Sequence, residues 1–341
     1  MIRLACDYQE GCHPKILEKL IATNLESTVG YGFDPYCESA KAKIRQACQA
    51  PNAEVFFLVG GTQTNSTVIR SILRPCEGVI AVTSGHINGH EAGAIEFGGH
   101  KVLTLPAHDG KMSAEDLERF IKLTFADASF EHGVIPAMVY ISQSTETGSV
   151  YSLAELTAIS EIAHRHDMPL FIDGARLGYG LASEGCDVTL ADIARLADVF
   201  YIGGTKVGAL LGEAVVFTNT AYTKHFFTIQ KQSGAVLAKG RVIGIQFDVL
   251  FTDDLYMQIS RHAVAMAMKL KEALKAKGYQ FYSESPSNQQ FVIVDNEKLK
   301  ELEKSVQVSH WCAVDDSRTA IRLCTSWATT EETIDQVIEM L

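Results

Sequence analysis

Long apolar runs are missing from this sequence: no stretch approaches the ~18 to 20 apolar residues that a membrane-spanning helix needs. Basic side chains are outnumbered, since 30 Lys and Arg stand against 41 Asp and Glu, which gives a net charge of −11. Nucleic acid and anionic membranes are therefore not expected partners, although a single pocket can be locally basic. Acidic residues also stand near the N-terminus where a secretory signal would need an apolar core. We expect a soluble, cytoplasmic protein.

The eight cysteines form no CxxC pair, so the spacing of a zinc ribbon or a thiol redox motif is absent. Spread thinly along the chain, they are typical of reduced thiols in a cytosolic protein. His86 and His90 stand next to Glu91, but the order is not HExxH, and no metal site is predicted. Apolar residues make up 47% of the chain and charged residues 21%, a globular balance that excludes disorder and a coiled coil.

Short β-rich apolar runs alternate with longer amphipathic segments over the first two thirds of the chain. Strands are predicted at 55–59, 79–82, 101–105, 137–142, 170–172, 199–202 and 214–217. Helices are predicted at 62–73 and 91–98, and after the capping signatures at Ser113 and Ser152. This β-α-β-α rhythm with near-continuous apolar strands predicts an α/β fold with a mainly parallel sheet covered by helices on both faces.

The pattern changes after residue 217. A long helix is predicted at 238–277, followed by strands near 290–294 and 320–323 and a last helix opened by Thr329. We therefore expect a large domain over 1–245, including an N-terminal segment 1–30, and a smaller C-terminal α/β domain over 246–341.

Three polar features follow predicted strands, at the edge where open parallel sheets collect ligands. The first is the sequence GGTQTN at 60–65, between a strand and a helix. Its small residues let backbone N–H groups approach an anion, and the helix N-terminus adds positive potential. It is neither a Walker sequence nor GxGxxG, so a plain strand-to-helix turn is an equal alternative.

The second feature is Asp173, which closes the strand in FIDGAR. A buried acid needs a partner, and a protonated ring nitrogen would be one. A local pair with Arg176 or a helix cap is the alternative reading, and for this residue alone it is the favoured one.

The third feature is Lys206, which follows a strand and a Gly-Gly turn. Partial burial lowers the pKa of a lysine and leaves a neutral amine that can form an imine, whereas an exposed turn lysine is the ordinary alternative. An anion cradle, an acid for a ring nitrogen and an imine-forming lysine together are the three groups that hold pyridoxal 5'-phosphate. Their joint occurrence predicts this cofactor.

The order of these motifs resembles that of the threonine aldolases, in the β-eliminating-lyase branch of the fold-type I pyridoxal-phosphate enzymes. The N-terminal Asp7-Tyr8 and Glu10-Gly11-Cys12-His13-Pro14 are most similar to the bacterial low-specificity subgroup. The resemblance rests on Tyr31-Gly32, GGTQTN at 60–65, GHINGHEAGAIE at 85–96, FIDGARL at 171–177, GGTK at 203–206, KQSGAVLAKGR at 231–241 and RLCTSW at 322–327. It implies cleavage of L-threonine, L-allo-threonine and related β-hydroxy-α-amino acids to glycine and an aldehyde.

The resemblance also implies residue roles. Lys206 would carry the cofactor, Asp173 would pair with its ring nitrogen, and His86 would stack on its ring and act in proton transfer. The remaining implied contacts are Gly61 and Thr62 with the phosphate, Arg322 with the substrate carboxylate, Arg176 with that carboxylate or the cofactor, and Tyr31 and Lys231 from a partner subunit. A homodimer or homotetramer with sites at the dimer interface is thus expected.

Two departures from the family pattern affect the site. Cys6 stands where relatives usually have Ser or Asn to help bind the carboxylate, and a thiol is a poorer hydrogen-bond donor. The segment 142–147 lacks the second histidine that many relatives carry, so the base for the β-hydroxyl group is open, with His86 and His90 as candidates. The alternatives are another reaction of the same cofactor (a β-eliminating lyase, an aminotransferase or an amino-acid racemase) or a non-catalytic binding protein.

Overall fold

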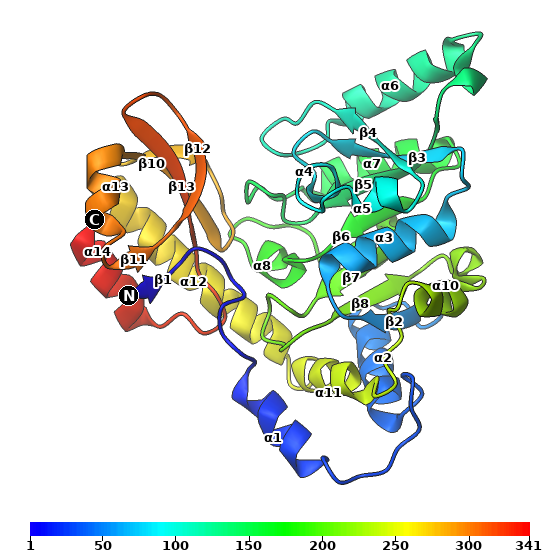
Figure 1. Cartoon of the computed structure of the whole chain (residues 1–341), viewed down its shortest axis with the longest axis horizontal. Coiled ribbons are helices and arrows are strands. Elements are labelled where there is room, and N and C mark those ends of the chain that lie inside the picture. Colours follow the sequence, from blue (N-terminus) through cyan, green and yellow to red (C-terminus); the bar gives the residue numbers. More distant parts are fainter.

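The computed structural model describes residues 1–341, and its largest feature is a seven-stranded sheet with strand order β2-β8-β7-β6-β5-β3-β4 (Figure 1). Its strands are β2 (Glu54–Leu58), β3 (Glu77–Val82), β4 (Lys101–Leu105), β5 (Ile135–Ser142), β6 (Leu170–Asp173), β7 (Val199–Gly203) and β8 (Glu213–Phe217). All neighbours are parallel except β8, which runs antiparallel to both β7 and β2. The predicted mainly parallel sheet is confirmed.

Helices cover both faces of this sheet because its strands alternate between two cores. In β7, Phe200 and Ile202 face one core, while Val199 and Tyr201 face the other. The helices packed on the first face include α2 (Pro35–Ala47), α6 (Ala114–Ala126), α7 (Leu153–Arg165), α9 (Leu190–Leu196) and α11 (Arg241–Leu250); those on the second include α3 (Gly61–Ile72), α5 (Ala94–Phe97) and α10 (Phe226–Gln232).

A separate antiparallel sheet of four strands, β12-β13-β10-β9, forms the second body of the fold (Figure 1). Its strands are β9 (Gln280–Ser283), β10 (Gln289–Asp295), β12 (Ser309–Ala313) and β13 (Arg318–Cys324), and α13 (Asn296–Leu302) and α14 (Glu331–Met340) belong to the same body. The long α12 (Leu255–Ala276) leads into it from the large sheet (Figure 1). Both chain ends lie in this body (Figure 1): β1 (Ile2–Arg3) pairs in parallel with β11 (Val306–Gln307), and the chain ends directly after α14.

The N-terminal chain leaves β1, passes between the two bodies and then forms α1 (Pro14–Ala22) below the large sheet (Figure 1). Short helices α4 (His86–Gly89) and α8 (Leu177–Leu181) follow β3 and β6. None of the helices combines the length and the apolar character that crossing a membrane requires.

Three predicted elements differ from the structure. The helix expected over 238–277 is two helices, because Asp253 and Asp254 adopt positive φ angles between α11 and α12. The helix expected at 91–98 shortens to α5, which starts after Gly93 in a left-handed conformation. The last helix is capped by Thr330, whose side chain accepts the Thr333 N–H, and not by Thr329.

Candidate active site

The ends of three adjacent parallel strands bring polar residues to one edge of the large sheet. Ser142 ends β5, Asp173 ends β6, and these two residues are register partners. Gly203 ends β7, and its N–H donates to the Gly174 carbonyl. Lys206 lies in the turn that follows. This is the edge at which parallel sheets bind ligands.

Asp173 is 4% exposed and sits among four hydrogen-bond donors. Oδ2 accepts from the Tyr140 hydroxyl at 2.6 Å and from Asn65 Nδ2 at 3.0 Å, and Oδ1 accepts from the Tyr201 hydroxyl and from the Ala175 N–H. Burial raises the pKa of Asp173, but the charge of His86 and these donors outweigh it, so the pKa lies below its usual value. The side chain forms no ion pair with Arg176, which rules out the local pair considered above.

The GGTQTN segment opens α3 beside this carboxylate. Gly60 is the N-cap and provides no side-chain cap, so the first N–H groups of the helix remain available to an anion. A Cβ at Gly61 would lie 3.2 Å from the Tyr201 hydroxyl, a tight approach that favours glycine. Thr62 is exposed at the same turn.

Lys206 lines a cavity of about 500 Å³ between the large sheet and the small one. The other lining residues are Tyr8, His86, His90, Glu146, Arg176, Ser309, His310, Trp311 and Arg322. Burial and the charge of Arg176 lower the pKa of Lys206. The exposed turn lysine of the alternative reading is therefore wrong: the Lys206 side chain is partly buried, and its pKa is shifted toward the neutral form.

His86 is fixed in the cavity wall through Glu91. Its Nδ1 lies 2.8 Å from Glu91 Oε1, which also accepts from Asn65 Nδ2 at 2.8 Å, and Asn65 in turn bonds Asp173. Burial would lower the pKa of His86, but the hydrogen bond to Glu91 and the charge of Asp173 raise it overall. His90 lies one turn away, with 5.7 Å between the two ring centroids, and burial and His86 lower its pKa.

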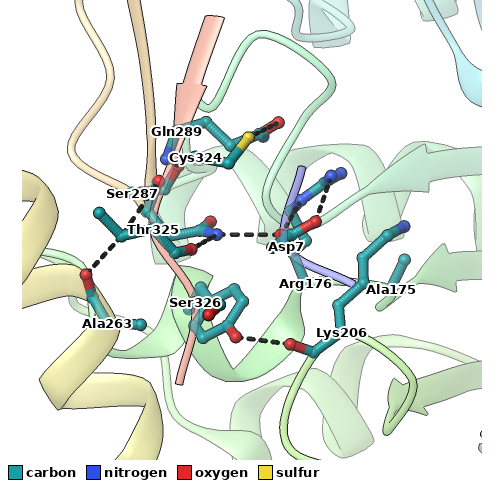
Figure 2. A network of polar contacts seen from close by, with 12 residues as sticks. Asp7, Ala175, Arg176, Lys206, Ala263, Ser287, Gln289, Cys324, Thr325 and Ser326 are labelled. Carbon is teal, nitrogen blue, oxygen red and sulfur yellow. Dashed lines mark hydrogen bonds and ion pairs between the residues drawn. The ribbon is translucent and has the colours of Figure 1, made fainter. Parts of the chain in front are cut away.

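Two arginines, Arg176 and Arg322, line the same cavity. Arg176 donates from Nε and Nη2 to Asp7 at 2.7 and 2.9 Å, and Asp7 also accepts from Asn288 at 2.9 Å (Figure 2). Arg322 donates to the Ala5 carbonyl at 3.1 Å, while its Nε is buried without a partner. Cys6 lies next to this contact in the chain and is partly buried, but it does not line the cavity.

Tyr31 and Lys231 are not brought to the cavity within this chain. They lie together elsewhere, with Lys231 Nζ 4.8 Å from the centre of the Tyr31 ring. Tyr31 is 49% exposed.

Several polar residues of the site were assigned no role from the sequence. They are Asp7, Asn65, Glu91, Tyr140, Glu146 and Tyr201. Asn65 and Glu91 stand inside recognised motifs, so their position in those motifs could have pointed to the site. The two tyrosines read as ordinary apolar strand residues, because only the fold shows that their hydroxyl groups meet at one carboxylate.

These residues fit pyridoxal phosphate on chemical grounds. The uncapped start of α3 suits a phosphate, the charged and buried Asp173 suits a protonated ring nitrogen, and the Lys206 amine suits an aldehyde. Both Asp173 oxygens accept hydrogen bonds from protein donors, which keep the carboxylate oriented and charged. Asn65 Oδ1, Glu91 Oε2 and Ser144 Oγ are buried without partners around the same region.

Comparison with known proteins agrees with this chemistry. The beta-eliminating lyase family matches residues 4–297. The chain belongs to the beta-eliminating lyase family. Within that family, it is 30% identical to a low-specificity L-threonine aldolase of Pseudomonas aeruginosa over 272 residues, 79% of this chain and 77% of the relative. It is 32% identical to the enzyme of the same name from a Pseudomonas sp. over 265 residues, 76% of this chain and 75% of the relative.

Similarity to solved structures covers nearly the whole chain of this beta-eliminating lyase family member. The threonine aldolase of Leishmania major superposes with a TM-score of 0.96 and 42% identity, and the match covers 99% of this chain and 98% of the other. An aspartate aminotransferase of Thermus thermophilus has a TM-score of 0.72 at 19% identity, which shows the shared fold alone. The threonine-aldolase resemblance and the fold-type I class are confirmed.

Proposed function

We propose that this chain is a pyridoxal-phosphate-dependent carbon–carbon lyase that cleaves L-threonine, L-allo-threonine and related β-hydroxy-α-amino acids to glycine and an aldehyde. One observation carries the proposal: the Lys206 amine and the two arginines line one cavity, with the charged Asp173 carboxylate at the adjacent strand end. The motif order and the threonine aldolase relatives support the same reaction.

The bound cofactor supplies an electron sink for the pair released at the substrate Cα. Lys206 would hold the cofactor through its aldehyde, because its lowered pKa leaves the amine able to react. Asp173 keeps its negative charge despite burial, and this charge would hold a proton on the ring nitrogen. Gly61, Thr62 and the start of α3 would hold the phosphate, and His86 would lie against the cofactor ring.

Arg322 receives the substrate α-carboxylate, because a guanidinium offers two donors in a planar fork and its Nε has no protein partner here. Arg176 adds positive charge at the same wall, held in place by Asp7. A fixed carboxylate turns the Cα–Cβ bond toward the position in which it breaks. His90, which lines the cavity, and Cys6, which lies beside the Arg322 contact with Ala5, would contact the substrate.

We also propose a homodimer or homotetramer in which Tyr31 and Lys231 of one copy complete the site of the other. Support comes from their placement outside the cavity and from exposed apolar side chains along the segment 17–33: Leu17, Ile21, Leu25, Val29, Tyr31 and Phe33. The division into domains 1–245 and 246–341 stays a prediction, as does a cytoplasmic location, for which the eight free cysteines are the supporting feature.

The test is a substrate panel with the purified, cofactor-loaded protein. L-threonine, L-allo-threonine and their D-enantiomers are supplied, and aldehyde and glycine are followed together. Equal amounts of aldehyde and glycine from the L-substrates are expected. Keto acid, ammonia or racemised substrate without aldehyde would instead point to an aminotransferase, a β-eliminating lyase or a racemase. A protein that stays colourless with added cofactor would contradict the whole proposal.

A further inference from the structure

Glu146 places a carboxyl group in the wall of the same cavity as Lys206. It follows β5, and its Oε1 accepts hydrogen bonds from the His86 backbone N–H at 3.0 Å and from the Ser142 hydroxyl at 2.7 Å. These two contacts fix the carboxyl group in one orientation. Both use the same oxygen, so Oε2 has no hydrogen bond to another residue and stays open to the cavity.

The surroundings of Glu146 adjust its affinity for a proton. Burial raises the pKa of Glu146, and the charge of Asp173 acts in the same direction, while the Ser142 hydroxyl and the His86 N–H stabilise the charged form. The charge of Glu146 in turn contributes to the raised pKa of the Tyr140 and Tyr151 phenols. A carboxylate whose pKa is moved toward neutral pH is a better proton acceptor than an ordinary one.

The two histidines in the same wall are less suited to accept a proton. His86 Nδ1 is engaged by Glu91, and the raised pKa of His86 favours the ring that already holds its proton. His90 is exposed, and no side-chain hydrogen bond fixes its ring. General base catalysis needs the acceptor at hydrogen-bond distance from the reacting proton, so a fixed group has the advantage.

We propose that Glu146 is a catalytic residue, and that its Oε2 accepts the proton of the substrate β-hydroxyl group; this rests on the proposed aldol cleavage. The O–H bond breaks and its electron pair becomes the second bond of the aldehyde carbonyl. The Cα–Cβ bond breaks and its pair stays on Cα, which then takes one proton to become glycine. Glu146 then releases the proton that it accepted, and the proton taken up at Cα balances this release, so the cycle consumes none.

The variant Glu146→Gln tests proton transfer separately from packing. Glutamine keeps an amide oxygen that can accept from the His86 N–H and from Ser142, but it cannot take a proton at neutral pH. We expect kcat for L-threonine cleavage to fall about 10²–10⁴-fold, the usual contribution of a general base. The visible absorbance of the bound cofactor and the spectral affinity for glycine are expected to remain. Exchange of the glycine α-proton in deuterated water, followed by NMR, also remains, because glycine has no β-hydroxyl group.

The variant Ser142→Ala gives a second, independent readout in the pH profile. The Ser142 hydroxyl stabilises the ionised carboxylate, so its removal raises the pKa of Glu146. The acid limb of kcat for cleavage is expected to move to higher pH with the plateau largely kept. In Glu146→Gln the same limb disappears from the residual activity.

Three results would overturn the proposal. If Glu146→Gln cleaves L-threonine at the wild-type rate, Glu146 takes no proton in the reaction. If the rate then falls only in His90→Asn, the base is His90. Parallel loss of cofactor absorbance, glycine exchange and cleavage shows a structural role. An acid limb unmoved in Ser142→Ala excludes Glu146 as the titrating group. Failure of the proposed function looks different: the wild-type protein exchanges glycine protons but releases no aldehyde, and both proposals then fall.

Discussion

Arg176 forms its ion pair with Asp7, across 169 residues of sequence, and not with Asp173 three residues before it. Asp7 is 1% exposed, and Asn288, from the small sheet's body, also donates to it. One carboxylate therefore joins the N-terminal segment, the turn after β6 and the start of β10. The cavity-lining Arg176 is therefore positioned by a part of the chain far from its own motif.

The variant Asp7→Asn is expected to weaken both the fold and the site. It leaves a buried guanidinium without its counter-charge, and breaking a buried pair costs about 3–5 kcal/mol. Denaturant unfolding should show a loss of that size, and KM for L-threonine should rise because Arg176 is no longer held. The control is Glu297→Gln, which removes an exposed pair with Lys300 and should leave unfolding nearly unchanged.

Arg322 can be tested against a neighbour on the same strand. Arg322→Ala should raise KM for L-threonine at least about tenfold and lower kcat less, because a bidentate carboxylate contact is lost while the Lys206 chemistry remains. Arg318→Ala, four residues earlier on β13, removes an exposed pair with Asp315 and should leave both constants unchanged. Equal effects of the two substitutions in steady-state kinetics would argue against a carboxylate site at Arg322.

The buried Glu213 should make the free energy of unfolding depend on pH. It is buried, its Oε2 accepts the Gly204 N–H at 3.1 Å, and burial raises its pKa from 4.5 to about 7. Between these values the folded protein binds more protons than the unfolded chain, so this group makes stability fall as pH rises.

Glu213→Gln should remove this contribution, which amounts to about 3 kcal/mol at pH 8 relative to pH 4. The measurement is the difference between the unfolding free energies of wild type and variant across that range. Glu301→Gln, an exposed carboxyl on α13, serves as the control. A constant difference between wild type and Glu213→Gln would show that Glu213 titrates normally.

Local signals in the sequence predicted much of the fold. The side chains of Ser113 and Ser152 each accept a hydrogen bond from the N–H group three residues later, as their capping patterns predicted. Strand β4 has the predicted bounds. The break between α11 and α12 was missed, because Asp253 and Asp254 carry no proline or glycine signal and only their backbone angles end the helix.

The same contrast holds for the site: residues within local motifs could be predicted from the sequence, and contacts between distant elements could not. Lys206, His86 and Arg322 could be recognised from the sequence because each stands in a motif. The structure then places all three in the wall of one cavity. The Asp7–Arg176 pair and the donors around Asp173 were not, since they depend on which strands become neighbours. Hydrogen bonds between elements distant in sequence leave no periodic pattern in any one of them.

The central claim is that Lys206 carries the cofactor, and borohydride reduction tests it directly. Reduction of the cofactor-loaded protein makes the lysine–cofactor bond permanent, and peptide mass spectrometry then locates it. We expect the added mass on the peptide that contains Lys206, with none in Lys206→Ala. A cofactor found on Lys231 or on another lysine, or the same covalent label in Lys206→Ala, would contradict the account.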